Sequence, residues 1–259
     1  MMTNQPSKSV QTVLYIDGQN FLARLRGILR RRGVSDVDLT HFDFWNFLNH
    51  VFSKQKVDLA QIYFAKVHAY RDTPEKSQEL LNREEELKSI LEEQGIKYIT
   101  AGSVRPRRRG DEIEFVEKGV DIRIAVDVVK DVIDGRVGTV LLMSSDSDLQ
   151  PAIYEARQRG AQVWYVGFQS RTNRGLMLTT DQQLLISNDD VAAFYARIDE
   201  SQLTNRTSQP SMTPPTKHQA SRPNDRPTSA LPSQPLHTTS QPPTTSPSQD
   251  TFNRPPWSR

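Results

Sequence analysis

The stretch V140-L-L-M-S-S-D-S-D-L-Q-P-A-I153 decides the fold that the sequence predicts. Its first four residues form a short, bounded apolar run, which is typical of a strand buried on both faces of a parallel sheet. Asp146 and Asp148 follow, and Pro151 fits the first turn of a helix for which Asp148 is the expected N-cap. Open α/β sheets bind ligands at this carboxyl edge. The stretch therefore predicts an acidic ligand site, although either acid alone is also consistent with a simple helix cap.

A second stretch, V13-L-Y-I-D-G-Q-N20, has the same design near the start of the chain. An apolar run ends in an acid, Asp17, and is followed by a glycine and by Asn20, a residue that caps helices well. We expect a strand that leads into a helix, with Asp17 at the junction.

The third stretch, G119-V-D-I-R-I-A-V-D-V-V129, predicts a helix with an acid in its first turn. Asp121 shares a helical face with apolar residues three, four and seven positions later, so it belongs to the buried face. An acid in such a place should be paired or bound to a metal ion. Asp127 has charged neighbours at helical spacing instead, and we interpret it as a solvated or salt-bridged position.

The composition separates a folded domain from a tail. Residues 201–259 contain twelve of the sixteen prolines, and Ser, Thr and Gln fill most of the remainder. Such a segment cannot bury enough apolar surface to offset the entropy lost on ordering, so we expect it to be disordered. We expect a flexible N-terminus at residues 1–10 and one domain at residues 11–200.

Charge and residue content exclude several classes of function. The net charge of +2 combines a tail of +4, from six Lys or Arg and two Asp, with a domain of −2. The sequence has no cysteine, which excludes disulfides, zinc thiolates and thiol catalysis. No apolar run has the length of a membrane span, and the first residues lack the apolar core of a signal peptide. A cytoplasmic protein without a membrane partner is the resulting expectation.

Strand and helix patterns alternate along the domain, which predicts a three-layer α/β/α fold with a mostly parallel sheet. A strand order of 3-2-1-4-5 would place Asp17 opposite Asp146 and Asp148, with Asp121 at the same edge. The predicted strands are 13–16, 59–67, 97–101, 139–144 and 163–167, with an edge strand at 112–116 and an ambiguous region at 173–186. The predicted helices are 21–31, 42–52, 75–93, 149–159 and 191–198, besides the one that starts at Asp121.

Four carboxylates at one edge would repel one another and raise each other's pKa values. A divalent cation removes this conflict, and carboxylate oxygens without His or Cys favour Mg²⁺ or Mn²⁺. One or two such ions would activate water for attack on a phosphate and stabilise the charge that develops there.

Two groups of arginines are candidates for binding nucleic-acid phosphates. The first group is equally well explained as an ordinary solvated surface. The second lies in a predicted loop, where no helical pairing accounts for three adjacent arginines, so we favour a function for it. The groups consist of Arg24, Arg30, Arg31 and Arg32, and of Arg105, Arg107, Arg108 and Arg109.

Three blocks, Y-I-D-G-Q-N (15–20), E-K-G-V-D-I-R-I-A-V-D (117–127) and M-S-S-D-S-D-L-Q-P-A-I (143–153), resemble the signature blocks of the NYN domain family, in particular its LabA-like branch. That family belongs to the PIN-like nuclease superfamily, and the resemblance spans roughly residues 11–198. It implies a PIN-like fold and metal-dependent RNA cleavage. Matched block by block, it implicates Asp17, Asp121, Asp146 and Asp148 as metal-binding and catalytic residues.

The resemblance also gives Asn20 a role as a helix cap that orders the site. Ser145 stands where the family usually has glycine, and it is expected to tighten the approach to the metal. A second departure, T180-D-Q-Q-L-L185, leaves the role of Asp181 open.

The sequence thus predicts a metal-dependent ribonuclease, endonucleolytic on single-stranded RNA. The alternative is a catalytically silent module of the same fold that binds RNA or a protein. A phosphatase-like or nucleotide-binding domain is disfavoured because the sequence has no glycine-rich phosphate loop. Homodimerisation and protein partners of the tail stay open at this stage.

Overall fold

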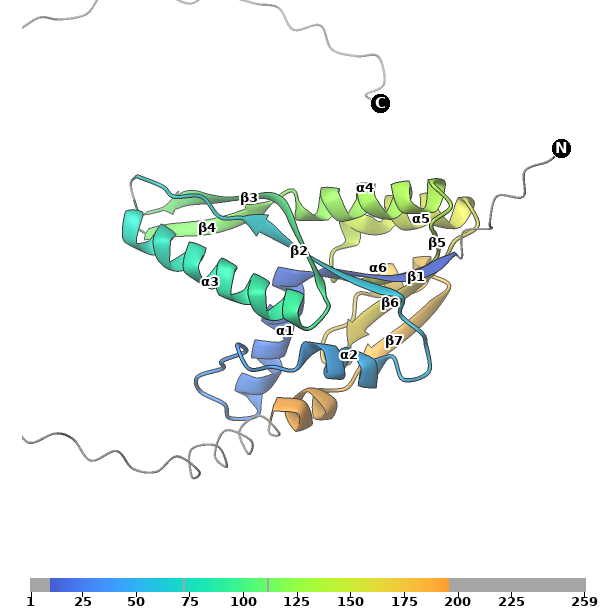
Figure 1. The fold of residues 1–259 in the computed structure, drawn as a ribbon, viewed down its shortest axis with the longest axis horizontal. Coiled ribbons are helices and arrows are strands. Elements are labelled where there is room, and N and C mark those ends of the chain that lie inside the picture. Colours follow the sequence, from blue (N-terminus) through green and yellow to red (C-terminus); the bar gives the residue numbers. More distant parts are fainter. Residues whose placement is uncertain (1–9, 72, 111, 196–259) are drawn as a thin grey trace, which may run out of the picture. The chain divides into compact units, whose positions relative to one another are not determined.

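The computed structural model describes residues 10–71, 73–110 and 112–195. The predicted tail at 201–259, most of the predicted N-terminal segment and the end of the helix predicted at 191–198 lie outside the described residues. Figure 1 shows the domain, in which a twisted sheet is covered by helices on two faces.

Seven strands form one sheet with the order β4-β3-β2-β1-β5-β6-β7. All neighbouring pairs are parallel except β3 and β4. The predicted order of five strands is confirmed, and the predicted edge strand and a strand from the ambiguous region extend the sheet at its two sides. The strands are β1 (Gln11–Asp17), β2 (Leu59–Lys66), β3 (Lys97–Arg109), β4 (Glu112–Lys118), β5 (Val137–Met143), β6 (Gln162–Phe168) and β7 (Gln182–Ile186).

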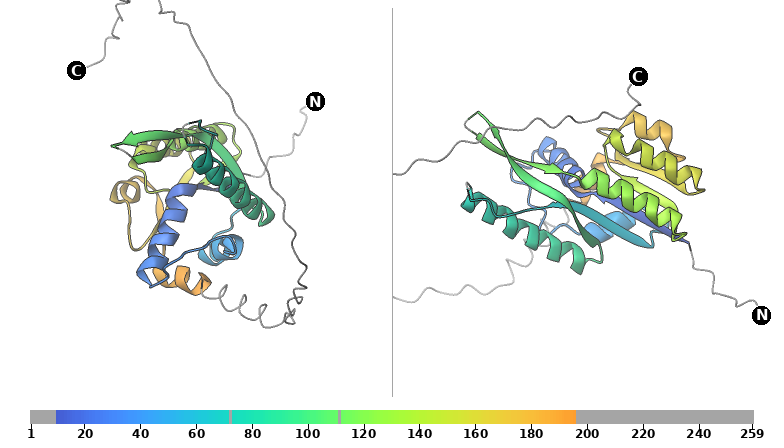
Figure 2. Two further views of the ribbon diagram at one scale, coloured as in Figure 1. Left: turned by 90° about the vertical axis from the view of Figure 1, so that its left-hand side faces the viewer. Right: turned by 90° about the horizontal axis from the view of Figure 1, so that it is seen from above.

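Successive side chains of a strand point to opposite faces of the sheet, and β1 uses this alternation to build two cores. Leu14 and Ile16 pack with α1, α2 and α3 on one face, whereas Val13 and Tyr15 pack with α4, α5 and α6 on the other. Figures 1 and 2 show these layers. The helices are α1 (Gly18–Arg31), α2 (Phe44–Val51), α3 (Pro74–Glu93), α4 (Val120–Ile133), α5 (Gln150–Gln158) and α6 (Arg174–Thr179), and a short 3₁₀ turn, η1 (Ser147–Leu149), precedes α5. Residues 188–195 are also helical.

The prediction of a loop at Arg105–Arg109 is wrong, because these residues form the distal half of β3. They pair with β4 in an antiparallel hairpin, with Arg107 opposite Glu114 and Pro106 opposite Phe115. Beyond Ser103, β3 pairs only with β4, so its other edge is free and tolerates a proline that has no N–H to donate. The hairpin extends past the carboxyl edge of the central strands (Figure 1).

Two buried tyrosines of the sheet form hydrogen bonds to α4. The hydroxyl of Tyr15 on β1 donates to Asp131 at 2.8 Å, and that of Tyr63 on β2 donates to Asp127 at 3.2 Å. Asp127 also forms an ion pair with Arg123 at 2.9 Å, which confirms the interpretation of this acid as a salt-bridged position. These contacts fix the position of α4 over the sheet.

None of the described helices is both long enough and apolar enough to cross a membrane.

We predict that Tyr15→Phe lowers the free energy of unfolding by about 1.5 kcal/mol, because it removes a hydrogen bond to a charged acceptor. Asp131 keeps its ion pair with Arg136, which limits the loss. Urea denaturation measures the change. The matched control is Tyr154→Phe, since Tyr154 is 64% exposed and its hydroxyl bonds no described residue. Equal stabilities of the two variants would contradict the assigned role of the Tyr15 hydroxyl.

Candidate functional site

Acidic residues from three parts of the chain meet at the carboxyl edge of the sheet. Asp121 lies in the first turn of α4, and Asp146 and Asp148 follow β5. Each of these three residues has a carboxylate oxygen within 4.8 Å of one from the other two. Asp17 ends β1 and lines the same hollow as Asp121 and Asp146. The fold thus brings three of the four predicted acids into one cluster and places the fourth beside them.

Asp17 is only 7% exposed, and donors on both sides fix its carboxylate. Its Oδ1 accepts from the backbone N–H of Asn20 at 3.1 Å, which makes Asp17 the N-cap of α1. Its Oδ2 accepts from the Asn20 side chain at 2.5 Å and from the Ser144 hydroxyl at 3.2 Å. The prediction that Asn20 is the cap is therefore wrong: Asn20 lies inside the helix and donates to the cap.

A hydrogen-bond network connects this carboxylate with the loop after β5. The Ser144 hydroxyl accepts from the N–H of Asp146 at 3.1 Å, and the Ser145 hydroxyl donates to the Asn20 side chain at 2.8 Å. Asn173, which the sequence did not single out, donates to the Ser145 carbonyl at 2.9 Å. Side chains from β1, α1 and the β6–α6 connection thus hold the loop in place.

Asp146, and not Asp148 as predicted, caps the turn after β5. Its Oδ1 accepts from the N–H of Asp148 at 2.9 Å, and α5 begins two residues after Asp148. The 3₁₀ turn η1, which contains Asp148, precedes the helix and moves the cap by two residues to Asp146. Asp148 is exposed.

Glu117, near the end of β4, is an acid of the site that sequence reasoning missed. Its Oε1 accepts from the backbone N–H of Ala65, and it lines the hollow with Asp17 and Asp121. Burial, and then the negative charges of Asp17 and Asp121, raise the pKa of the Glu117 carboxyl to about 7, against the bond from Ala65. Its position in the sequence could have identified it. A strand antiparallel to β3 runs back toward the carboxyl edge of the central strands, so an acid near its end lies close to the acidic cluster.

The hollow between these acids has a volume of about 650 Å³, and Asp148 lines a different hollow. Its donors toward a cation are carboxylate oxygens, with no imidazole or thiolate among the described lining residues. Such oxygens are the ligands that Mg²⁺ and Mn²⁺ prefer. No described basic side chain forms an ion pair with Asp121, Asp146 or Asp148, so a cation would meet unpaired carboxylates here. The residues present therefore fit a divalent cation.

Arg24 is the predicted arginine that lies beside the acids. Its guanidinium is 3.4 Å from the Ser145 hydroxyl, and it lines a narrow depression with Asn20 and Arg171. Burial, and then the positive charge of Arg171, lower the pKa of Arg24. Arg171, in the connection after β6, was not identified from the sequence. The two residues place positive charge at a depression that Ser144 and Ser145, the residues before Asp146, also line.

The other predicted arginines lie farther away. Arg30, Arg31 and Arg32 are at the far end of α1, ~20 Å along the helix from Asp17 at 1.5 Å per residue. Arg32 there forms an ion pair with Asp189.

The hairpin arginines lie on the ribbon that extends past the acidic edge. Arg105, Arg107, Arg108 and Arg109 are all exposed, and Arg109 pairs with Glu114 at 3.3 Å. Asp181, whose role was open, lies apart from the acidic cluster, where it accepts from Arg157 and from the Val163 N–H, each at 2.8 Å.

Comparisons with known proteins show the family of the chain. The NYN domain profile matches residues 11–187, so the chain belongs to the NYN domain family, whose fold is PIN-like and whose members are generally nucleases. Among solved structures, it is similar to a protein of unknown function from Vibrio parahaemolyticus, with 23% identity, a TM-score of 0.44 and coverage of 72% of this chain and 98% of that chain. No curated protein matches the sequence.

We predict that Glu117 makes stability fall as the pH rises. Its pKa of about 7 in the folded protein lies above the ordinary value of 4.5. The neutral form therefore stabilises the fold fully below pH 4.5, and this contribution is lost as the pH rises through 7. The melting temperature of Glu117→Gln should rise relative to wild type between pH 5 and pH 8. A constant difference across that range, measured without divalent cations, would show that this carboxyl does not titrate as assigned.

Proposed function

We propose that this protein is a divalent-metal-dependent ribonuclease of the LabA-like branch of NYN proteins, acting endonucleolytically on single-stranded RNA. The observation that carries the proposal is the cluster of Asp121, Asp146 and Asp148, with carboxylate oxygens within 4.8 Å of one another, in a chain of the NYN family. Structural ion pairs do not account for this cluster, because no described basic side chain forms an ion pair with any of the three acids.

Asp121, Asp146 and Asp148 would hold Mg²⁺ or Mn²⁺, with Asp17 beside them. When bound, such an ion supplies an activated water and stabilises negative charge on the phosphate. Asp17 keeps its position because Asn20 and Ser144 donate to both of its oxygens. This rigid support suits a residue that has to present a carboxylate at a fixed place.

Glu117 is suited to move a proton. A general base works best when its pKa lies near the working pH, and burial together with the neighbouring acids raises the pKa of Glu117 to about 7. Among the described residues only the Ala65 N–H bonds this carboxyl, through Oε1, so Oε2 is the oxygen that would accept a proton.

The placement of basic residues supports RNA as the substrate and an internal bond as the target. Arg105, Arg107, Arg108 and Arg109 extend from the β3–β4 side of the acids, while Arg24 and Arg171 lie toward β6. A strand that crosses the acidic edge would then have phosphates neutralised on both sides of the bond to be cleaved. Contacts on both sides favour endonucleolytic cleavage. Arg30, Arg31 and Arg32 are candidates for binding more distant phosphates of a long RNA.

The proposal is tested by incubating the purified protein with single-stranded RNA labelled at one end, in Mn²⁺, in Mg²⁺ and in EDTA. We predict internal cleavage products with Mn²⁺ or Mg²⁺ and none with EDTA. Asp148→Asn should lower the cleavage rate at least ~100-fold, the usual scale for loss of one group that stabilises transition-state charge. The same variant should bind RNA as well as wild type does or better, because it removes a negative charge.

A variant with Arg107→Ala and Arg108→Ala separates binding from catalysis in the same assay. It should bind RNA more weakly and with a smaller salt dependence, by about one unit of slope for each lost phosphate contact. If Asp148→Asn cleaves RNA at the wild-type rate, the activity comes from another site or from a contaminant. If wild type binds RNA but cleaves none with either metal, the protein is a silent binding module instead.

A further inference from the structure

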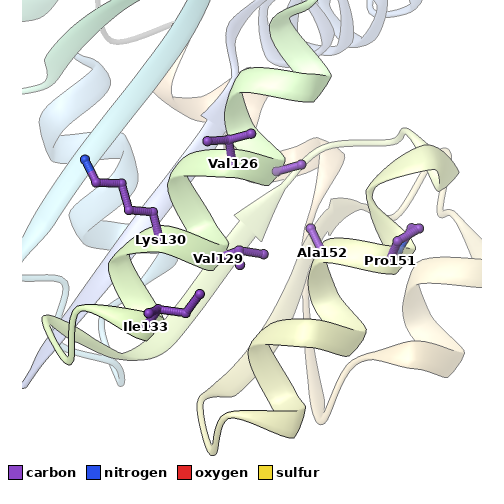
Figure 3. A pocket seen from close by; sticks show the side chains of 7 residues that line it. Val126, Val129, Lys130, Ile133, Pro151 and Ala152 are labelled. Atoms are coloured by element: carbon purple, nitrogen blue, oxygen red, sulfur yellow. The ribbon is translucent and has the colours of Figure 1, made fainter.

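The outer face of α4 carries a stripe of aliphatic side chains that the described residues leave largely exposed. We call Ile122, Val126, Val129 and Ile133 the α4 stripe. Ile122 is 65% exposed, and Val126 and Ile133 are each 54% exposed. Figure 3 shows Val126, Val129 and Ile133 along this face of the helix. Exposed apolar residues scattered singly are normal, but a contiguous group of this kind marks an interaction surface.

A hollow of about 580 Å³ lies beside the stripe, between α4 and α5. Val126, Val129 and Ile133 line it from α4, and Pro151 and Ala152 line it from α5 (Figure 3). Its lining is almost entirely apolar, with Lys130 as its one charged member. An apolar ridge would fit here, and a nucleic-acid backbone would not.

The residue types and spacings of the α4 stripe are the same from either end of the helix. Its members are spaced four, three and four residues apart, and their order is Ile, Val, Val, Ile. A two-fold axis through the centre of the stripe would therefore place Ile122 against Ile133 of the second copy and Val126 against Val129. Self-complementarity of this kind is what an isologous dimer interface requires. The spacing is also the one by which two helices pack along a shared apolar seam.

Charges beside the stripe favour the antiparallel arrangement. Arg123 lies near the N-terminal end of α4 and is 50% exposed, and Asp134 follows the C-terminal end and is 43% exposed. Within the chain Arg123 pairs with Asp127 and Asp134 pairs with Arg136. Parallel helices would place Arg123 against its own copy, whereas antiparallel helices keep the two arginines apart.

We propose that the α4 stripe is the interface of a homodimer in which the α4 helices of two copies pack antiparallel across a two-fold axis. The aliphatic side chains of the two stripes then cover one another, beside the hollow between α4 and α5. Dimerisation does not depend on the nuclease activity, because the stripe contains none of the acids. It does have a consequence for the site: Ile122 also lines the acidic hollow, so the second copy stands next to the entrance for RNA.

The absence of cysteine from the sequence allows a direct test of this geometry. Two single variants of the full chain, Ile122→Cys and Ile133→Cys, are oxidised mildly, separately and after mixing. In the antiparallel dimer position 122 faces position 133, so disulfide-linked dimers should form in the mixture. Neither variant should cross-link alone, because identical positions lie ~16 Å apart along the helices, whereas a disulfide requires Cα atoms within about 7 Å. Cross-linking of Ile122→Cys alone, or no cross-linking in the mixture, would overturn the proposal.

Light scattering after size-exclusion chromatography provides the second measurement. Wild type should have twice the 29.5 kDa mass of one chain, and Val126→Asp should have the mass of one chain with an unchanged circular dichroism spectrum. Trp45→Asp is the matched control, because Trp45 is 40% exposed on α2, on the opposite face of the sheet, and this variant should stay dimeric. A monomeric wild type at 50 µM, or a dimeric Val126→Asp, would contradict the proposed interface.

Discussion

Mutual repulsion among carboxylates held at one edge of the sheet is the constraint on which this site depends. The free energy for holding them comes from the two apolar cores, which fix β1, β5 and α4 regardless of the charges at their ends. Local donors reduce the conflict further, because Asn20 and Ser144 satisfy Asp17, and the N–H of Asp148 satisfies Asp146. Burial first, and then the charges of Asp17 and Asp121, raise the pKa of Glu117 at the same edge.

The sequence predicted the fold well, because apolar runs and the connections between them determine it. The run Val13–Ile16 has no charged member, which suits a strand covered on both faces, and Ile16 indeed lies between Ile62 and Met143. Parallel strands then bring the ends of β1 and β5 to the same edge. The proximity of acids far apart in the sequence follows from this connectivity, so it was predictable without knowledge of any side-chain geometry.

Features that depend on competition between similar local signals were not predictable. Asp146 and Asp148 are equally good caps, and the 3₁₀ turn that favours Asp146 depends on the packing of Leu149. Asp17 and Asn20 present the same ambiguity for α1. The run of arginines with Pro106 indicated a loop, but its pairing with β4 made it a strand. Glu117 is held in the site by a hydrogen bond from the backbone N–H of Ala65. The two residues are 52 positions apart, so no local sequence pattern predicts this contact.

Direct measurement of cation binding tests the central claim, that the fold holds these acids as a divalent-metal site. Isothermal titration calorimetry with Mn²⁺ should show a binding isotherm for wild type and none for a variant with Asp121→Asn and Asp146→Asn. The control is Asp127→Asn, whose acid lies on the same helix as Asp121 but is paired with Arg123, and it should bind Mn²⁺ as wild type does. Equal binding by wild type and the double variant, or no binding by wild type, would contradict the account.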